Sequence, residues 1–156
     1  MVDQHALDLQ FMAAALAEAQ QGFDEGGIPI GSVIVADGQI IGRGHNRRVQ
    51  QGNPILHGEM DAFQNAGRLR ADVYRRATLY STLSPCPMCA GTSILYQIPR
   101  IVIGENRTVA ETTLCEDWLL RARGVEVVVL DQPECYALMQ KFIQLHPEIW
   151  NEDIGY

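Results

Sequence analysis

The chain is organised around a six-residue stretch, Ser84-Pro85-Cys86-Pro87-Met88-Cys89. An apolar run at residues 77–83 precedes it and predicts a strand, and a second apolar run at residues 90–96 can continue as a helix. Proline is tolerated in the first turn of a helix, where its missing N–H costs nothing. We therefore expect a strand that leads directly into a helix, with both cysteines in the first turn of that helix.

The two cysteines have the spacing of metal ligands. Cys86 and Cys89 are three residues apart, so both sulfurs lie on one face of the helix and can reach one ion. A helix N-terminus also favours the thiolate, which is the form that binds zinc. Two thiolates leave zinc short of ligands, and His57 is the best candidate for a third. Three protein ligands leave the fourth position to water, which is typical of catalytic zinc.

Glu59 follows His57 by two residues and is the candidate proton carrier. In a regular helix, residues i and i+2 point about 200° apart. His57 must therefore lie in a loosely wound first turn if both side chains are to meet in one pocket.

Two other interpretations of the cysteine pair stay open. A Cys-x-x-Cys pair after a strand and at the start of a helix is also found in thioredoxin-type redox proteins. A closed structural zinc site is the other, with Cys115 or Cys135 as its fourth ligand. The presence of H-x-E together with P-C-x-x-C favours the catalytic site over both.

Length and composition predict a single domain over residues 1–156, since 47% of its 156 residues are hydrophobic. The net charge of −7 argues against a nucleic-acid partner, which needs a basic surface. Four cysteines do not suggest a disulfide framework. The first residues lack the features of a signal peptide, and no apolar run is long enough to span a membrane, so we expect a cytoplasmic protein.

Hydrophobic periodicity predicts an α/β fold with one mixed sheet and helices on both faces. The predicted helices are residues 3–23, 57–69, 86–96, 111–123 and 132–145. The predicted strands are residues 28–36, 39–44, 77–83, 100–104 and 125–130, and the last of these is rich in valine and is expected to be buried. Asp37-Gly38 is a strong hairpin signal between the first two strands. The metal is expected at the carboxyl end of strand 77–83, where open α/β sheets bind ligands.

Two further segments carry candidate substrate contacts. Asn46 follows a strand, and its amide can both donate and accept a hydrogen bond, which suits a carbonyl beside a ring N–H. An ordinary turn asparagine is the alternative interpretation. The tail at residues 146–156 contains Trp150 and Asp153. We expect this tail to fold over the pocket with Asp153 facing a substrate amine, although Trp150 packing on the core is an alternative.

H-x-E at residues 57–59 and P-C-x-x-C at residues 85–89 together form the signature of zinc-dependent base deaminases. The chain resembles the small zinc cytosine deaminases of the fungal type, within the cytidine deaminase-like superfamily. The likeness covers nearly the whole length. Besides this signature it rests on Gly26-Gly27-Ile28-Pro29-Ile30-Gly31, Gly42-Arg43-Gly44-His45-Asn46, Ile98-Pro99-Arg100, Gly104-Glu105-Asn106, Trp150 and Glu152-Asp153-Ile154-Gly155.

The resemblance implies a three-layer αβα sandwich around a five-stranded mixed sheet, and a homodimer. It implies a zinc ion on His57, Cys86 and Cys89, with Glu59 as the proton shuttle. It further implies that Asn46 and the Gly58 backbone N–H hold the ring carbonyl of the substrate. The other implied contacts are Asp153 and the Ser84 carbonyl for the exocyclic amine, and Trp150, Ile154 and Ile30 as pocket walls.

The resemblance implies hydrolytic deamination of a free aminopyrimidine, with cytosine converted to uracil and ammonia in pyrimidine salvage. One segment departs from the family, which places an aromatic residue over the substrate after the fourth strand. Residues 107–114 contain no aromatic side chain, and this segment looks a few residues longer than in the family. The identity of the base is therefore open, and isocytosine, guanine or a related amino-heterocycle are alternatives.

Two more distant alternatives remain. Deamination of adenosine in tRNA uses the same signature, but the acidic net charge and a covered pocket argue against a flipped nucleotide. A non-catalytic zinc or redox module is the alternative from another class.

Overall fold

The computed structural model describes residues 2–155, so Met1 and Tyr156, the ends of the predicted domain and tail, lie outside the described residues. A five-stranded sheet with the order β2-β1-β3-β4-β5 forms its centre. β1 pairs antiparallel with β2 and β3, whereas β3, β4 and β5 run parallel, so the predicted mixed sheet is confirmed. The strands are β1 (Gly31–Ala36), β2 (Gln39–His45), β3 (Ala77–Leu83), β4 (Arg100–Glu105) and β5 (Glu126–Val129).

Five helices lie where the periodicity predicts helix. They are α1 (Gln4–Asp24), α3 (Gly58–Ala66), α5 (Pro87–Leu95), α6 (Asp117–Ala122) and α7 (Pro133–Leu145). Three short helices were not expected, because each is too short to show a hydrophobic period. They are α2 (Arg48–Gln51), α4 (Ala71–Tyr74) and α8 (Pro147–Asp153), the last of which forms most of the predicted tail.

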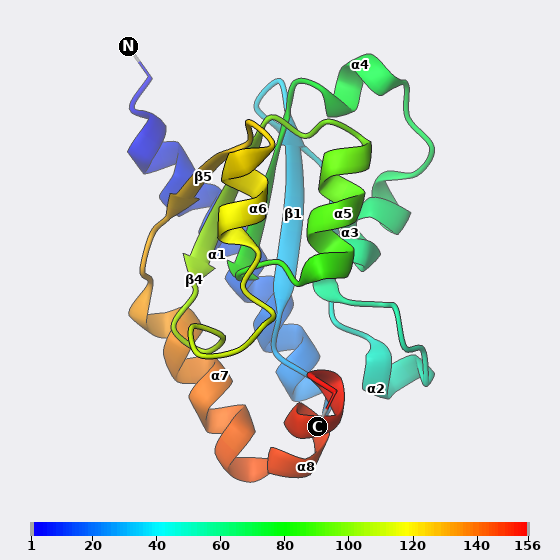
Figure 1. Ribbon diagram of the computed structural model, residues 1–156, viewed down its shortest axis with the longest axis vertical. Helices are drawn as coiled ribbons and strands as arrows, with labels where there is room; N and C mark the ends of the chain where they lie inside the picture. The colour runs from blue at the N-terminus through cyan, green and yellow to red at the C-terminus, as the bar shows by residue number, and fades with distance from the viewer. Residues whose placement is uncertain (1, 156) are drawn as a thin grey trace.

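The sheet separates two layers of helices, which is the predicted αβα sandwich. One face packs against α3, α5 and α6, and the other packs against α1 and α7. Figure 1 shows α5 and α6 in front of the sheet and α1 behind it. A third apolar cluster, which includes Ile30, Phe142 and Trp150, joins α7 and α8 to the end of the sheet where β3 stops. Within residues 2–155, no helix has both the length and the apolar character to cross a membrane.

The hairpin between β1 and β2 forms as the sequence predicts. Asp37 and Gly38 both have positive φ, 53° and 74°, as a type I′ turn requires. The register shifts between Ile34 and Val35, which marks a bulge in this pair of strands.

Two expectations about the second half of the chain are wrong. The predicted helix at residues 111–123 begins only at Asp117. The Thr112 hydroxyl donates to the Val109 carbonyl and accepts from the Leu114 N–H, so it competes with helical hydrogen bonds. The predicted strand at residues 125–130 is not buried on both faces, because β5 is the edge strand of the sheet and its residues are exposed or half-buried.

A buried ion pair fixes α1 against the sheet. The carboxylate of Asp8, on α1, accepts hydrogen bonds from both terminal nitrogens of Arg100, at 2.8 and 2.6 Å, and from the Tyr80 hydroxyl at 2.7 Å. Asp8 is 2% exposed, so these three bonds replace its hydration. Burial raises the pKa of Asp8, but the hydrogen bonds from Arg100 and Tyr80 outweigh it and hold the pKa below the usual value.

Replacing this carboxylate should destabilise the fold. We expect Asp8→Asn to lower the free energy of unfolding at pH 7 by about 3 kcal/mol, because Arg100 loses its buried partner. Because the pKa of Asp8 is lower in the folded state, its carboxylate stabilises the folded protein fully at pH values above its unfolded-state pKa of about 3.9. This stabilisation is lost as the pH falls through the folded-state pKa of Asp8. The difference in unfolding free energy between wild type and Asp8→Asn, measured by urea denaturation, should therefore disappear at acidic pH.

Asp72→Asn is the matched control, since Asp72 is exposed and pairs only with surface arginines. It should leave the unfolding free energy nearly unchanged. Equal losses in the two variants would contradict the role of Asp8.

Candidate active site

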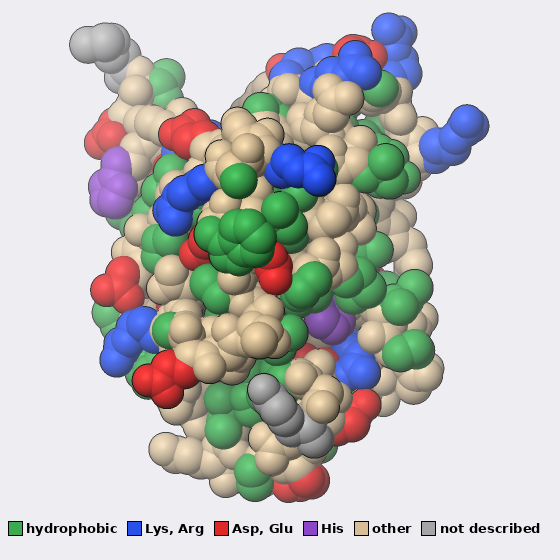
Figure 2. All heavy atoms as spheres, viewed as in Figure 1, with side chains coloured by type: hydrophobic (Ala, Val, Ile, Leu, Met, Phe, Trp, Pro, Cys, Tyr) green, Lys and Arg blue, Asp and Glu red, His purple; other side chains and the backbone are tan. Residues whose placement is uncertain are grey.

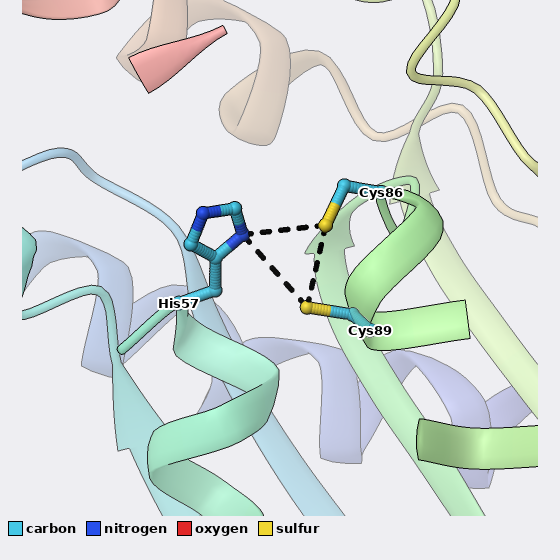
Figure 3. Close-up of side chains that lie close together, drawn as sticks. All are labelled: His57, Cys86 and Cys89. Carbon is cyan, nitrogen blue, oxygen red and sulfur yellow. Dashed lines mark hydrogen bonds between the residues drawn. The ribbon is translucent and has the colours of Figure 1, made fainter. Parts of the chain in front are cut away.

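Two helix N-termini meet at the carboxyl end of β3. His57 is the N-cap of α3, with φ −64° and ψ 166°, and Cys86 is the N-cap of α5, with φ −73° and ψ 173°. Because both N-caps have extended backbone, their side chains project beyond the helix ends towards each other. Figure 3 shows His57 facing Cys86 and Cys89 across the space between the two helices. The expected departure of His57 from regular helix is thus observed.

The three side chains have the spacing of a tetrahedral metal site. His57 Nδ1 lies 3.5 Å from the Cys86 sulfur and 3.8 Å from the Cys89 sulfur, and the two sulfurs are 3.7 Å apart. Tetrahedral zinc, with Zn–S of about 2.3 Å and Zn–N of about 2.0 Å, places its ligand sulfurs about 3.8 Å apart and sulfur and nitrogen about 3.5 Å apart. The observed distances match these values, so the cluster fits a zinc ion.

The charges of the cluster suit a cation. The hydrogen bond from Cys89 lowers the pKa of Cys86 to about 4, with further help from His57 and against the effect of burial. Burial disfavours the charged form of His57, but its interaction with Cys86 outweighs this and raises the pKa of His57. Cys86 is therefore a thiolate at neutral pH, which is the form that coordinates zinc.

No fourth protein ligand joins this cluster among the described residues, where His57, Cys86 and Cys89 form the one group with metal-binding spacing. The Cys115 sulfur instead lies 3.6 Å from the Ser84 hydroxyl, and Cys135 packs in the core beneath α1. An open, three-ligand site agrees with this arrangement, whereas the closed structural site considered from the sequence does not.

Glu59 lies in the first turn of α3, beside the metal cluster. Its side chain is 3% exposed, and its Oε1 accepts from the hydroxyls of Ser81 at 3.3 Å and Ser32 at 3.4 Å. These serines face each other in the pairing of β1 with β3. Burial, reinforced by the charge of Cys86, raises the pKa of Glu59. Sequence reasoning missed both serines, although a hydroxyl within an apolar strand is a recognisable signal.

A cavity of about 280 Å³ opens beside the cluster. Six of the predicted site residues line it: Ile30, His57, Ser84, Cys86, and the tail residues Asp153 and Ile154. Sequence reasoning missed its other lining residues, which are Leu83, Pro87, Met88, Val109 and Leu114. Val109 and Leu114 belong to the segment without an aromatic side chain, so this part of the wall is aliphatic.

The remaining predicted residues lie around this cavity and do not line it. Cys89 and Asn46 are fully buried, and Trp150 packs in the apolar cluster that includes Ile30. Asn46 Oδ1 accepts from the Arg48 N–H at 3.0 Å, which fixes the amide with Nδ2 as the free donor. That buried Nδ2 has no hydrogen-bond partner, which points to a ligand acceptor.

Gly58 is the first residue of α3, so its N–H has no intrahelical acceptor. A Cβ on Gly58 would lie 2.8 Å from the carbonyl oxygen of Ile30. The backbone at Ile30, just before β1, therefore lies so close to position 58 that only glycine fits there.

Ser84 is held from behind by a buried carboxylate. Its hydroxyl donates to Asp117, whose other oxygen accepts from the Asn106 amide at 3.1 Å. Asp117 is 6% exposed and lies at the start of α6. It thus ties the residues that follow β3 and β4 to one another at the rim of the cavity.

Loss of one ligand should weaken metal binding strongly. We expect Cys86→Ser to purify with less than stoichiometric zinc, because two ligands of the three-residue cluster bind zinc far more weakly than three. Elemental analysis by mass spectrometry measures this directly. Cys115→Ser is the matched control and should retain one zinc per chain; loss of zinc in that variant would revive the closed structural site.

Three comparisons with known proteins agree with this geometry. The family described as "Cytidine and deoxycytidylate deaminase zinc-binding region" matches residues 5–105. A cytosine deaminase of Candida albicans is 49% identical over 149 residues, which cover 95% of this chain and 97% of that protein. A tRNA-specific adenosine deaminase of Streptococcus pyogenes is 44% identical over 98 residues, which cover 62% of this chain and 61% of that protein.

A solved structure of a guanine deaminase from Nitrosomonas europaea has a TM-score of 0.72 at 22% identity, covering 85% of this chain and 82% of that one, and supports the fold alone. The match to the family covers both the histidine and the cysteine pair of the cluster. The chain therefore belongs to the cytidine and deoxycytidylate deaminase family of zinc-binding enzymes.

Proposed function

We propose that this chain deaminates free cytosine by hydrolysis, giving uracil and ammonia. The observation that carries the proposal is the cavity of about 280 Å³ between His57, Cys86 and the tail residues Asp153 and Ile154. A site with a tail residue on its wall suits a small free base better than a nucleotide within a polymer. The extensive similarity to a Candida albicans cytosine deaminase supports the same substrate.

The chemistry requires one proton carrier, and Glu59 suits this role. Zinc, when bound, supplies a water that is acidic enough to react near neutral pH. Glu59 takes one proton from that water and delivers it to the ring nitrogen beside the attacked carbon, while the water oxygen bonds to that carbon. Glu59 then takes the second proton from the added hydroxyl and delivers it to the amine. The C–N bond breaks as the new ring carbonyl forms, so ammonia departs neutral. Burial of Glu59 brings its pKa towards neutral pH, which favours both transfers.

The polar groups around the cavity suit the two ends of an aminopyrimidine. Asn46 Nδ2, the buried donor without a partner, and the Gly58 N–H donate to the ring carbonyl. Asp153 and the Ser84 carbonyl accept from the exocyclic amine. Ile154 and Ile30 line the cavity and contact the ring, and Trp150 packs behind them in the apolar cluster. Adenine has no carbonyl for Asn46, so it would leave that buried amide unpaired.

The aliphatic wall favours a second group of substrates. Val109 and Leu114 replace the flat aromatic cover of the family, and a ring that differs from cytosine can contact them equally well. Isocytosine and guanine carry the same N–C–NH₂ unit and are the second candidates.

An ammonia-release screen tests the function. With cytosine, isocytosine, guanine, adenine, creatinine and cytidine as substrates, we expect the highest kcat/KM with cytosine. Ammonia release from none of these, or from cytidine or adenine alone, would contradict the proposal. Glu59→Gln is the control variant, which should retain zinc and lose at least about 10²- to 10⁴-fold in kcat because it cannot carry protons.

We further propose that residues 1–156 act as one domain, with the tail at residues 146–156 as the cover of the active site. The proposed reaction suits pyrimidine salvage in the cytoplasm.

We also infer that the chain forms a homodimer, through the face of α3 and α5. A groove of about 500 Å³ lies there, between Leu56 and Phe63 on one side and Leu95 and Tyr96 on the other. Leu95 is 70% exposed, which is unusual for an apolar side chain beside a groove. Figure 2 shows the main group of exposed hydrophobic side chains over α6, beside α5.

Sedimentation tests this interface. Wild-type protein should sediment at twice the mass of the 17.3 kDa chain, and Leu95→Glu should shift it towards the monomer, since a charge would be buried. Leu145→Glu is the control, because Leu145 is also exposed but lies at the end of α7. A monomeric wild-type protein at micromolar concentration would contradict the interface.

A further inference from the structure

Arg48 joins three segments that surround the candidate active site. It is the first residue of α2, and its side chain is 13% exposed. One terminal nitrogen of its guanidinium donates to Asp153 and the other donates to Glu152 at 3.2 Å. Its Nε donates to the carbonyl of Pro54 at 2.9 Å, in the loop that leads to His57.

The backbone of Arg48 contacts Asn46, the residue proposed to bind the ring carbonyl of the substrate. Its N–H donates to Asn46 Oδ1 at 3.0 Å, which leaves Asn46 Nδ2 as the unpaired donor. Arg48 therefore bonds directly to Asn46 and to Asp153, the two side chains proposed to read opposite ends of the substrate. Asn46 and Asp153 are far apart in the sequence, and Figure 1 shows α2 and α8 beside each other at one end of the sheet.

Asp153 has little else to hold it in place. Its side chain is 4% exposed, so its carboxylate has lost most of its hydration. The Nε2 of His57 is 3.9 Å away, too far for a hydrogen bond. Apolar packing of Trp150 and Ile154 holds the rest of the helix, so the guanidinium of Arg48 is the polar contact that fixes the carboxylate above His57.

We propose that Arg48 is a positioning residue that latches the C-terminal helix α8 over the active site and aims Asp153 at the substrate amine. The proposal rests on the deamination proposed above for its effect on turnover, but the latch itself is a property of the free protein. The planar guanidinium suits this task, because its fork reaches two carboxylates while Nε reaches Pro54. A lysine offers one point of charge and cannot make all three contacts.

The fluorescence of Trp150 reports whether α8 stays in place. The chain has two tryptophans. Trp150 lies on α8 and is 7% exposed, whereas Trp118 lies on α6 and is 67% exposed. In a Trp118→Phe background, fluorescence therefore reports on α8 alone. Release of α8 should shift Trp150 emission to longer wavelength and increase its quenching by acrylamide.

The experiment compares Arg48→Met with its Trp118→Phe parent. We expect KM for cytosine to rise on the order of tenfold or more, with a smaller change in kcat, since the metal ligands and Glu59 stay in place. Acrylamide quenching of Trp150 should rise in the same variant, and zinc content should stay at the parent value. Arg48→Lys should fall between the two in both measurements, and it replaces Arg48→Met if that variant does not fold.

Glu152→Gln is the matched control. It removes the charge of Glu152, the second carboxylate that contacts Arg48. The Glu152 side chain is 67% exposed, so its loss should change neither KM nor the quenching of Trp150. A double variant, Arg48→Met with Asp153→Asn, should lose no more in kcat/KM than Asp153→Asn alone, because that single change already affects both the Arg48 contact and the substrate contact.

Each other outcome overturns the latch. Unchanged quenching with a raised KM would mean that Arg48 acts by some route other than α8, and raised quenching with an unchanged KM would mean that α8 does not position Asp153. If the parent protein releases no ammonia from cytosine, the proposed function fails. In that case the quenching of Trp150 still tests whether Arg48 holds α8.

Discussion

The site depends on two helix N-termini that meet at the carboxyl edge of one sheet. His57 and Cys86 are 29 residues apart in the chain, yet their reactive atoms lie within 3.5 Å of each other. The distance is set by backbone, because each residue is an N-cap in extended conformation at the end of a helix packed on the same face of the sheet. A small rotation of either helix would separate the ligands by more than a metal–ligand bond tolerates.

Buried carboxylates around this point are each held by their own donors. Glu59 accepts from paired serines on β1 and β3, Asp117 accepts from Ser84 and Asn106, and Asp153 accepts from Arg48. An unpaired carboxylate in such a setting would be costly, and it would also repel the thiolates. The arrangement lets an acidic residue lie beside negatively charged metal ligands while its position stays defined.

The cavity combines a few polar side chains at the ends of helices and strands with a largely apolar wall. In that wall, Val109 and Leu114 come from a segment without regular structure. At the start of this segment, the Glu105 carboxylate accepts hydrogen bonds from the N–H and the hydroxyl of Thr108. Further along, the Thr112 hydroxyl accepts from the Leu114 N–H. The metal cluster and the aliphatic part of the cavity wall thus come from different parts of the fold.

The sequence by itself determined the three residues of the metal cluster and the positions along the chain of the five strands and of five helices, because these features are local. A Cys-x-x-Cys behind proline, a histidine two residues before a glutamate, and alternating or helical apolar patterns each constrain a few neighbouring residues. Local sequence patterns gave wrong predictions where side-chain hydrogen bonds set the start of a helix or where the place of a strand in the sheet sets its burial. Thr112 diverted the start of α6, and β5 was half-exposed because it lies at the edge. Only the tertiary structure brought Ser32 and Ser81 to Glu59 and Arg48 to Asp153, since the pairing of distant polar side chains follows from packing and leaves no periodic trace in the chain.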